Sequence, residues 1–278
     1  MRVAVTGAGG GLGRAFLDSA GSEHEVHGFT HEDLDVRSAS AVEAKLLPVE
    51  PDAVFHFAAM TAVDACEEDP REAAATNVLG TGNVAGAARR AGATLLAIST
   101  DYVFDGEKEK PYDENDIPNP ISVYGKTKYE GEVAAKEVGG DLLIVRTAWV
   151  YGAGNDFVSK AVKRLAEGEE VGAIADQIGS PTHVAHLAER LIPLVTSGIR
   201  GLVHLGGPEP TSWYEFLVRA KAVGGLKGEV EAQKAEELAR PAKRPANSAL
   251  TSVIIRGEVP PMPSLEEGIR KVLSDVGA

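Results

Sequence analysis

Cysteine is almost absent from this sequence: Cys66 is the single one among 278 residues. One thiol can form no disulfide within the chain and no cysteine-based metal site, which is typical of proteins in a reducing cytoplasm. No apolar run approaches the roughly 18 residues of a membrane-spanning helix. The N-terminus leads directly into RVAV, without the basic, apolar and small-residue pattern of a signal peptide. We therefore expect a cytoplasmic protein.

Positive charge is also scarce. The chain carries 28 Lys and Arg against 41 Asp and Glu, a formal net charge of −13. Such a protein repels phosphate backbones and anionic lipids, so we expect neither nucleic acid nor a membrane as partner. A small anionic ligand would need helix N-termini or a few chosen Arg and Lys side chains. The hydrophobic fraction of 44% is ordinary for a globular protein, and it leaves monomer or homodimer open.

A glycine-rich turn follows the first predicted strand. Residues 2–6 form an apolar run, and Gly7, Gly10 and Gly13 come next, before a helical segment that extends to about residue 20. Between a strand and a helix, such glycines allow a tight turn, a close approach of backbone to a pyrophosphate, and close helix–sheet packing. This position predicts a dinucleotide site rather than a merely flexible turn.

Strands and helices alternate through the first half of the chain. Further strands are predicted at 25–30, 52–57, 94–99 and 142–147, and helices at 38–47 and 69–91. This series indicates an α/β fold with a Rossmann-type, doubly wound parallel sheet. We expect a dinucleotide-binding domain at 1–151. Residues 152–278 would form mainly a smaller, substrate-binding α/β subdomain, with some segments returning to the sheet.

A tyrosine and a lysine stand four residues apart at an expected helix start. On a helix, Tyr124 and Lys128 share one face, so the phenol and the ammonium can approach the same small volume. The ammonium and the positive helix end would both favour phenolate and lower the tyrosine pKa from about 10. Such a tyrosine exchanges a proton with a substrate oxygen. The alternative is an ordinary contact on a helix surface.

Small and polar residues gather where the predicted strands end. Ala58 and Ala59 follow the third strand and would let a flat ring lie against the backbone. Thr100 and Asp101 follow the fourth strand, where a hydroxyl could bond a substrate carbonyl. Trp149 follows the fifth strand, either as core filler or as a stacking wall. Parallel strands place these ends at one edge of a sheet, and ligands bind there.

Other polar residues have more than one interpretation. His56, inside the third strand, is expected to be a core histidine with satisfied hydrogen bonds. Asn77 either packs a helix or holds a group near the site. The second strand ends at Thr30 without the acid that often bonds the ribose 2′-hydroxyl, because the nearby acids, such as Asp35, come later. The choice between NADH and NADPH therefore stays open.

The alternation loosens after residue 152. The sequence predicts helices at 155–167, 183–195 and 265–276, a helix starting at Ser212 with Glu215 in a capping box, and a short strand at 201–205. Residues 240–245, RPAKRP, form a basic, stiff segment that either clamps a diphosphate or is an exposed loop. His183 and His186 share a helix face without a third ligand, so we expect no metal.

Several segments together resemble the extended short-chain dehydrogenase/reductases, and within them the dTDP-4-dehydrorhamnose reductases. The most specific is STDYVFDG at 99–106. The others are AMTAVD at 59–64, VYGKTK at 123–128, RTAWVYG at 146–152, DQIGSPT at 176–182 and RPANS at 244–248. They span nearly the whole chain.

The resemblance implies reduction of the C4 ketone of dTDP-6-deoxy-L-lyxo-4-hexulose to dTDP-L-rhamnose by NADPH or NADH. Tyr124 would be the proton donor, and Lys128 would tune it and hold the nicotinamide ribose. The cofactor would contact Gly7, Gly10, Gly11, Leu12, Gly13, Thr30, Asp35, Val36, Ala58, Ala59, Met60 and Thr61. The dTDP-sugar would contact Thr100, Asp101, Trp149, Arg244 and Asn247. A magnesium-bridged dimer occurs in some members, but its carboxylate positions have no clear match here.

Two alternatives share this resemblance. One is a nucleotide-sugar epimerase or dehydratase, which would retain tightly bound NAD⁺. The other is a non-catalytic relative, such as the regulatory subunit of methionine adenosyltransferase.

Overall fold

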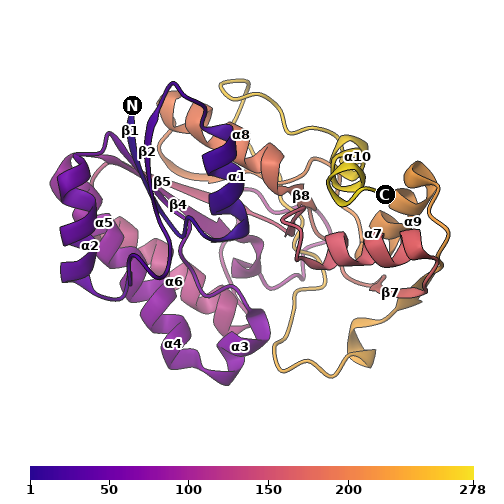
Figure 1. Cartoon of the computed structure of the whole chain (residues 1–278). Coiled ribbons are helices and arrows are strands. Elements are labelled where there is room, and N and C mark those ends of the chain that lie inside the picture. Colours follow the sequence, from indigo (N-terminus) through magenta and orange to yellow (C-terminus); the bar gives the residue numbers. More distant parts are fainter.

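A parallel sheet of six strands forms the centre of the molecule (Figure 1). The computed structural model describes residues 1–278. In spatial order the strands are β2 (Glu25–Phe29), β1 (Arg2–Thr6), β3 (Ala53–His56), β4 (Thr94–Thr100), β5 (Leu142–Thr147) and β9 (Gly201–His204). All neighbouring pairs are parallel. The predicted Rossmann-type α/β fold is therefore confirmed, with strand ends within one or two residues of expectation.

Helices cover both faces of this sheet, because the strands are apolar on both sides. One face packs against α1 (Gly11–Ser19) and α8 (Val184–Thr196), whose Phe16 and Leu187 meet Val5 and Val145 in one buried cluster. The other face packs against α2 (Ala39–Leu46), α5 (Gly80–Ala91) and α6 (Val123–Val138). Residues from the second half of the chain, in α8 and β9, thus belong to this first layered body.

The helix predicted at 69–91 is interrupted. Asp69 caps α4 (Pro70–Ala74) by accepting from the Glu72 amide, but a π-helical turn, Ala75–Leu79, separates α4 from α5. Asn77 lies buried in that turn, and its side chain bonds the backbone of Met60. Wide turns of this kind often occur at functional sites, and the periodicity of the sequence did not reveal this one.

A second lobe packs beside the sheet, at the right of Figure 1. Its core lies between α7 (Phe157–Glu167), α9 (Trp213–Gly224) and α10 (Leu265–Val276). Two small parallel sheets near it were not predicted, because strands this short carry little periodicity. They pair β7 (Val171–Ile174) with β10 (Val230–Gln233) and β6 (Val150–Tyr151) with β8 (Thr182–His183). Between α3 (Val63–Glu68) and this lobe runs the loop at 234–250.

The structure also tests the predictions for His56 and for the start of α9. His56 is a satisfied core histidine, since its ring nitrogens lie 2.7 Å from Thr6 Oγ1 and 3.1 Å from Thr81 Oγ1. Ser212 caps α9, as predicted, by accepting from the Glu215 amide. The full capping box is wrong, because the Glu215 carboxylate accepts from the Thr211 hydroxyl instead.

Candidate active site

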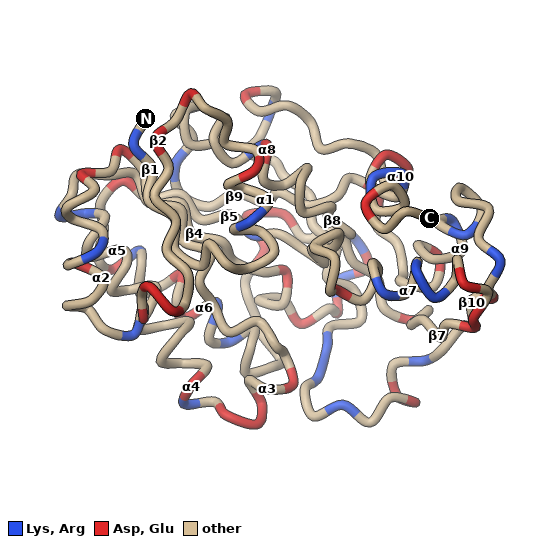
Figure 2. The backbone as a smooth tube through the Cα atoms, in the orientation of Figure 1, with Lys and Arg blue, Asp and Glu red and all other residues tan.

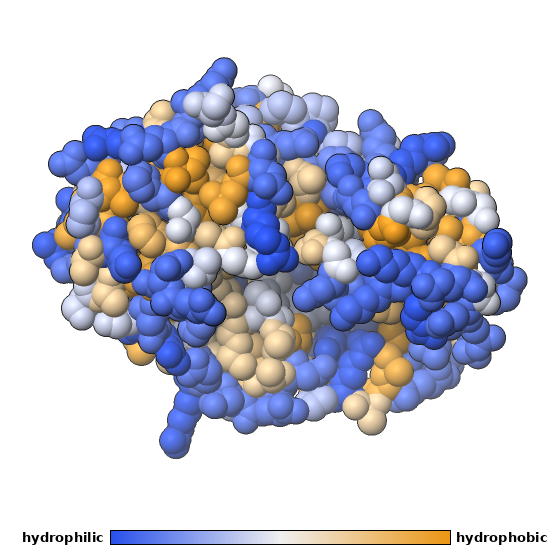
Figure 3. All heavy atoms as spheres, in the orientation of Figure 1, coloured by the Kyte–Doolittle hydropathy of each residue, from blue (hydrophilic) through white to orange (hydrophobic).

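A cleft of about 540 Å³ opens at the carboxyl ends of β1, β3, β4 and β5. We call it the central cleft, and Figure 3 shows the surface hollowed between the two lobes. Residues that sequence reasoning selected separately meet here: Gly7, Gly10, Gly11, Leu12, Gly13, Ala59, Thr61, Thr100, Asp101, Tyr124 and Trp149. Its volume lies within the range of small-molecule sites.

The glycine turn forms one wall of the cleft, and this wall has no side chains at its glycine positions. Gly7 has φ +73°, and a Cβ there would lie 2.5 Å from the Ala58 amide nitrogen. A Cβ on Gly13 would lie 2.3 Å from the Gly7 carbonyl oxygen, so both glycines are required by the backbone itself. At Gly10, the nearest atom to an added Cβ is 3.3 Å away. Gly10, like Gly9, whose added Cβ would lie 3.5 Å from Thr30, therefore leaves room for a ligand beside the turn.

The N-terminus of α1 points into this bare space. Gly10 is its N-cap, without a side-chain cap, and no acidic residue stands in the first turn. Unpaired amides at a helix start carry partial positive charge and bind phosphate groups. In a protein of net charge −13, this is a local positive site of the kind that an anionic ligand needs.

A second cleft, of about 530 Å³, continues from the glycine turn toward the end of β2. Thr30, Val36 and Ala58 line this β2 cleft, as the resemblance implies for a cofactor. Asp35 does not line it, because its carboxylate bonds Arg37 over 2.8 Å. Asp33, two residues before Asp35, accepts from the Thr30 amide and hydroxyl and so shapes the rim.

The segment after β3 separates the two clefts. Ala59 lines both of them and Thr61 lines the central cleft. Met60 is on neither wall. Asn77 Oδ1 accepts from its amide over 2.8 Å, and Asn77 Nδ2 donates to its carbonyl over 3.1 Å. Both roles weighed for Asn77 are present, because it holds this backbone segment beside the site and its Nδ2 also donates to Thr127 of α6 over 3.1 Å.

Tyr124, in the first turn of α6, faces the central cleft. Its ring meets the edge of Tyr102 with centroids 5.8 Å apart. Loss of hydration raises the pKa of Tyr124 well above its usual range, although a hydrogen bond with Thr100 opposes the shift. The expectation of an acidified phenol is therefore wrong for the protein's own groups, and Tyr124 keeps its proton at neutral pH.

Lys128 explains this difference. It lies one turn after Tyr124, but its ammonium donates to the Ile98 carbonyl over 2.7 Å and is absent from the charges that shift Tyr124. Burial lowers the pKa of Lys128 to about 8, with the Glu132 carboxylate opposing the shift. Spacing on the helix was predicted correctly. The direction of the ammonium was set by a carbonyl on the neighbouring strand.

Thr100 and Asp101 form a buried polar group beside Tyr124. The Thr100 hydroxyl donates to Asp101 Oδ1 over 3.0 Å, and the Ser248 hydroxyl donates to Asp101 Oδ2. Burial raises the pKa of Asp101 to about 7, and these two hydrogen bonds oppose the rise. Near neutral pH, the carboxyl group is therefore present in both protonation states.

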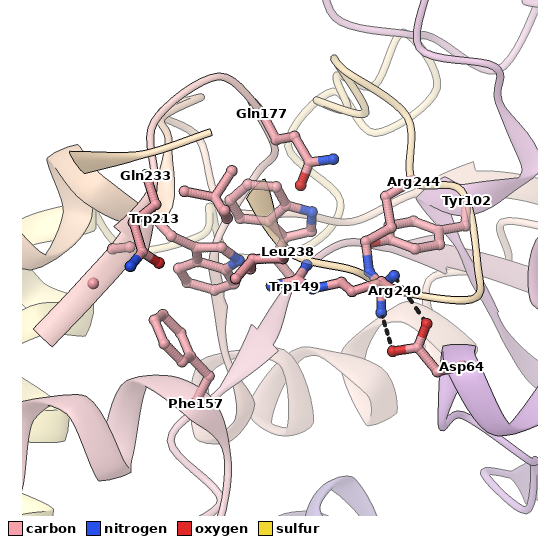
Figure 4. A pocket seen from close by; sticks show the side chains of 13 residues that line it. Asp64, Tyr102, Trp149, Phe157, Gln177, Trp213, Gln233, Leu238, Arg240 and Arg244 are labelled. Carbon is pink, nitrogen blue, oxygen red and sulfur yellow. Dashed lines mark hydrogen bonds and ion pairs between the residues drawn. The ribbon is translucent and has the colours of Figure 1, made fainter. Parts of the chain in front are cut away.

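A third cleft, of about 450 Å³, adjoins the central one on the side of the second lobe. Figure 4 shows its walls, and we call it the tryptophan cleft. Trp149 stacks on Trp213 with centroids 4.4 Å apart and planes 20° from parallel. Trp149 has φ +47°, rare for a bulky residue, and its indole lies on the bare backbone of Gly179. It is a stacking wall that lines both clefts rather than core filler.

Two arginines border the tryptophan cleft (Figure 4). Arg244 donates to both oxygens of Asp64, over 3.1 and 2.7 Å, and so ties its loop to α3. Arg240 takes part in no hydrogen bond or ion pair and leaves one guanidinium charge uncompensated at the rim, where Figure 2 marks basic positions along the loop. In this basic segment Arg244 therefore has a structural role, whereas Arg240 is free to bind an anion.

Asn247 lines none of these three clefts. Its Nδ2 donates to the Lys108 carbonyl over 2.8 Å and its Oδ1 accepts from the Ala249 amide. Two backbone segments therefore hold its amide group, and contact of Asn247 with a substrate stays a prediction.

Sequence reasoning missed several lining residues. Tyr102, Thr147 and Trp213 border the central cleft, and Ser248 reaches Asp101 from a segment 147 residues away. Tyr102 and Ser248 lay inside the segments that carried the family resemblance, but no property of the residues themselves pointed to a role. Trp213 had a usable signal, because it is one of only two tryptophans.

The comparisons with known proteins agree with this geometry. The family model described as RmlD substrate binding domain matches residues 1–277. The chain belongs to this family. Other members of the RmlD family are similar over most of their length. A dTDP-4-dehydrorhamnose reductase from Sinorhizobium fredii is 37% identical over 265 residues, which covers 90% of this chain and 88% of the relative. The spore coat polysaccharide biosynthesis protein SpsK from Bacillus subtilis is also 37% identical, over 254 residues, 90% of this chain and 89% of that protein.

Solved structures of the RmlD family have the same fold. The crystal structure of dTDP-4-dehydrorhamnose reductase from Bacillus anthracis in complex with NADP superposes with a TM-score of 0.94 at 36% identity and covers 99% of both chains. None of the helices here is long and apolar enough to cross a membrane.

Proposed function

We propose that this chain is an NAD(P)H-dependent oxidoreductase that reduces the C4 ketone of dTDP-6-deoxy-L-lyxo-4-hexulose to dTDP-L-rhamnose. The observation that carries the proposal is the meeting, in one cleft, of a bare glycine turn with a protonated tyrosine and a stacked tryptophan pair. The glycine turn suits a dinucleotide, the tyrosine can protonate a developing alkoxide, and the tryptophan pair suits a nucleotide sugar. Relatives named for this reaction, more than 35% identical, support the assignment.

The cofactor would lie across two of the clefts. Its adenosine half would occupy the β2 cleft beside Thr30 and Val36, and its pyrophosphate would meet the amides of Gly10, Gly11 and Leu12. The nicotinamide half would then enter the central cleft. The acids at the end of β2 select neither NADPH nor NADH, so both reductants are tested below.

The bound cofactor would supply a hydride to the ketone carbon. Tyr124 would give its phenolic proton to the ketone oxygen, which becomes the new hydroxyl. The raised pKa of Tyr124 suits this role, because the proton stays on the phenol until negative charge develops on the oxygen beside it. Proton donation of this kind typically accelerates a reaction by about 10²–10⁴-fold.

Residues behind Tyr124 would restore its proton. Thr100 lines the central cleft with Tyr124 and donates to Asp101 Oδ1, and the pKa of Asp101, about 7, lets it deliver a proton near neutral pH. Lys128 is held by the Ile98 carbonyl at the end of β4. The N–H groups left free on its ammonium would hold the nicotinamide ribose.

The tryptophan cleft would hold the substrate's nucleotide part. Trp149 would wall the sugar, because it faces both clefts. Arg240, with no acid of its own, would pair with the diphosphate, and Arg244 would contribute positive charge while bonded to Asp64. We also propose that the enzyme acts in the cytoplasm, as a monomer or a homodimer.

A turnover assay tests the proposal. Purified protein is mixed with NADPH or NADH and a panel of 4-keto nucleotide sugars, and cofactor absorbance and products are followed. We expect oxidation of the cofactor with the 4-keto dTDP-sugar and formation of dTDP-L-rhamnose. Absence of oxidation with every sugar would favour the binding-protein alternative, and tightly bound NAD⁺ in the purified protein would favour the epimerase or dehydratase.

A further inference from the structure

Thr147 carries a buried hydroxyl without a hydrogen-bond partner. It is the last residue of β5, only 5% exposed, and its Oγ1 meets no donor or acceptor. Its neighbour Arg146 is paired twice with Glu132, over 2.8 and 2.7 Å, and although its Nη1 is also unpaired, Arg146 does not line the central cleft. Buried hydroxyls are rarely left unpaired, because the lost hydration costs free energy. An orphan on the wall of a cleft therefore suggests a ligand as the missing partner.

The direction of the Thr147 side chain follows from the strand. Successive side chains alternate between faces, so Thr147 shares a face with Leu143 and Val145. Those two residues pack with Phe16 of α1. The hydroxyl thus lies on the side of the sheet that carries α1 and the glycine turn, and it lines the central cleft. Thr100 is its partner residue on β4.

We propose that the Thr147 hydroxyl hydrogen-bonds the carboxamide of the nicotinamide ring and so fixes the orientation of the ring toward the ketone. The proposal rests on the proposed function for its cofactor. With adenosine in the β2 cleft and pyrophosphate at the glycine turn, the nicotinamide is the part that reaches the ends of β4 and β5. A carboxamide offers both a donor and an acceptor, and a hydroxyl can match either.

Thr147→Val removes the hydroxyl at nearly constant volume, and Thr147→Ser keeps it. NADPH affinity is measured by fluorescence titration without any sugar. We expect the dissociation constant to rise about 3- to 10-fold for the valine variant, the usual effect of one lost hydrogen bond, and to stay within about twofold of wild type for the serine variant. Thr196→Val, which removes an exposed hydroxyl from α8, should not change it.

A fragment of the cofactor locates the contact. 2′-Phospho-ADP-ribose contains the adenosine and pyrophosphate of NADPH but lacks the nicotinamide. We expect Thr147→Val and wild type to bind this fragment equally. Equal weakening for NADPH and the fragment would overturn the proposal, and so would an unchanged NADPH affinity, whether or not the KM for the sugar rises.

Thermal unfolding of the ligand-free protein separates binding from structure. Since the hydroxyl is unpaired, Thr147→Val should melt at the wild-type temperature or above. A lower melting temperature together with weaker NADPH binding would mean a structural hydroxyl and would overturn the proposal. These measurements use no sugar, so failure of wild type to reduce the 4-keto sugar would refute the proposed function separately.

Discussion

The central cleft and the tryptophan cleft adjoin each other but hold their polar groups in opposite ways. In the central cleft, Asp101 is buried at the end of a strand and bonded to neutral hydroxyls. In the tryptophan cleft, Arg240 is exposed and has no ion-pair partner, and Arg244, on the same loop, is bonded to Asp64. In the central cleft, loss of hydration therefore determines the pKa of the polar groups. In the tryptophan cleft, the main electrostatic effect is attraction between the arginines and a charged ligand. A proton transfer needs the former, and capture of a charged nucleotide needs the latter.

Removal of the Tyr124 hydroxyl should cause the largest loss of activity among the changes proposed for the two clefts. Tyr124→Phe is expected to lower kcat by about 10²–10⁴-fold, because the alkoxide loses its proton donor, while NADPH binding changes little. Steady-state kinetics and a fluorescence titration check both parts. Tyr129→Phe, on the same helix but outside the cleft, is the matched control. If the Tyr124→Phe enzyme kept the wild-type kcat, Tyr124 would not be the proton donor.

Buried Asp101 should make stability depend on pH. Its pKa is raised from 3.8 to about 7, so the folded protein binds a proton that the unfolded chain has released between these values. The contribution to stability is complete below about pH 4 and is lost as the pH rises through 7, amounting to roughly 4 kcal/mol.

Asp101→Asn tests this dependence, because the amide does not titrate. We expect the free energy of unfolding, measured in denaturant between pH 5 and 8, to fall with pH in wild type and to fall by about 3 kcal/mol less in the variant, since that is the part of the contribution lost between pH 5 and 7. Raised salt should change this difference little, since the group is buried. Parallel curves for the two proteins would mean that Asp101 is hydrated.

Loss of Arg240 should have the smallest effect and the strongest dependence on salt. Arg240→Ala is expected to raise the KM for the dTDP-sugar about 10-fold, the scale of one charged hydrogen bond, with kcat nearly constant. The effect should shrink at high ionic strength, because the side chain is exposed. Lys243→Ala, three residues along the same loop and outside the cleft, is the control. An equal rise of KM in both variants would indicate general attraction by the loop.

Local sequence was sufficient for the layered half of the protein. The glycine turn, the alternating strands and helices and the Tyr124 helix depend on contacts between residues near in the chain, and on the rule that parallel strands end at one edge. These features place most of the central cleft before any coordinates are known.

Only the tertiary structure decided where the side-chain hydrogen bonds go. Lys128 donates to the Ile98 carbonyl and Asn247 to the Lys108 carbonyl. Ser248 donates to Asp101, which lies 147 positions earlier in the chain. The π turn at Asn77 and the Trp149–Trp213 stack arose in the same way. Periodicity encodes which face of an element is buried. It does not encode which distant carbonyl or ring lies opposite, and those partners set the direction of the Lys128 ammonium and the shape of the tryptophan cleft.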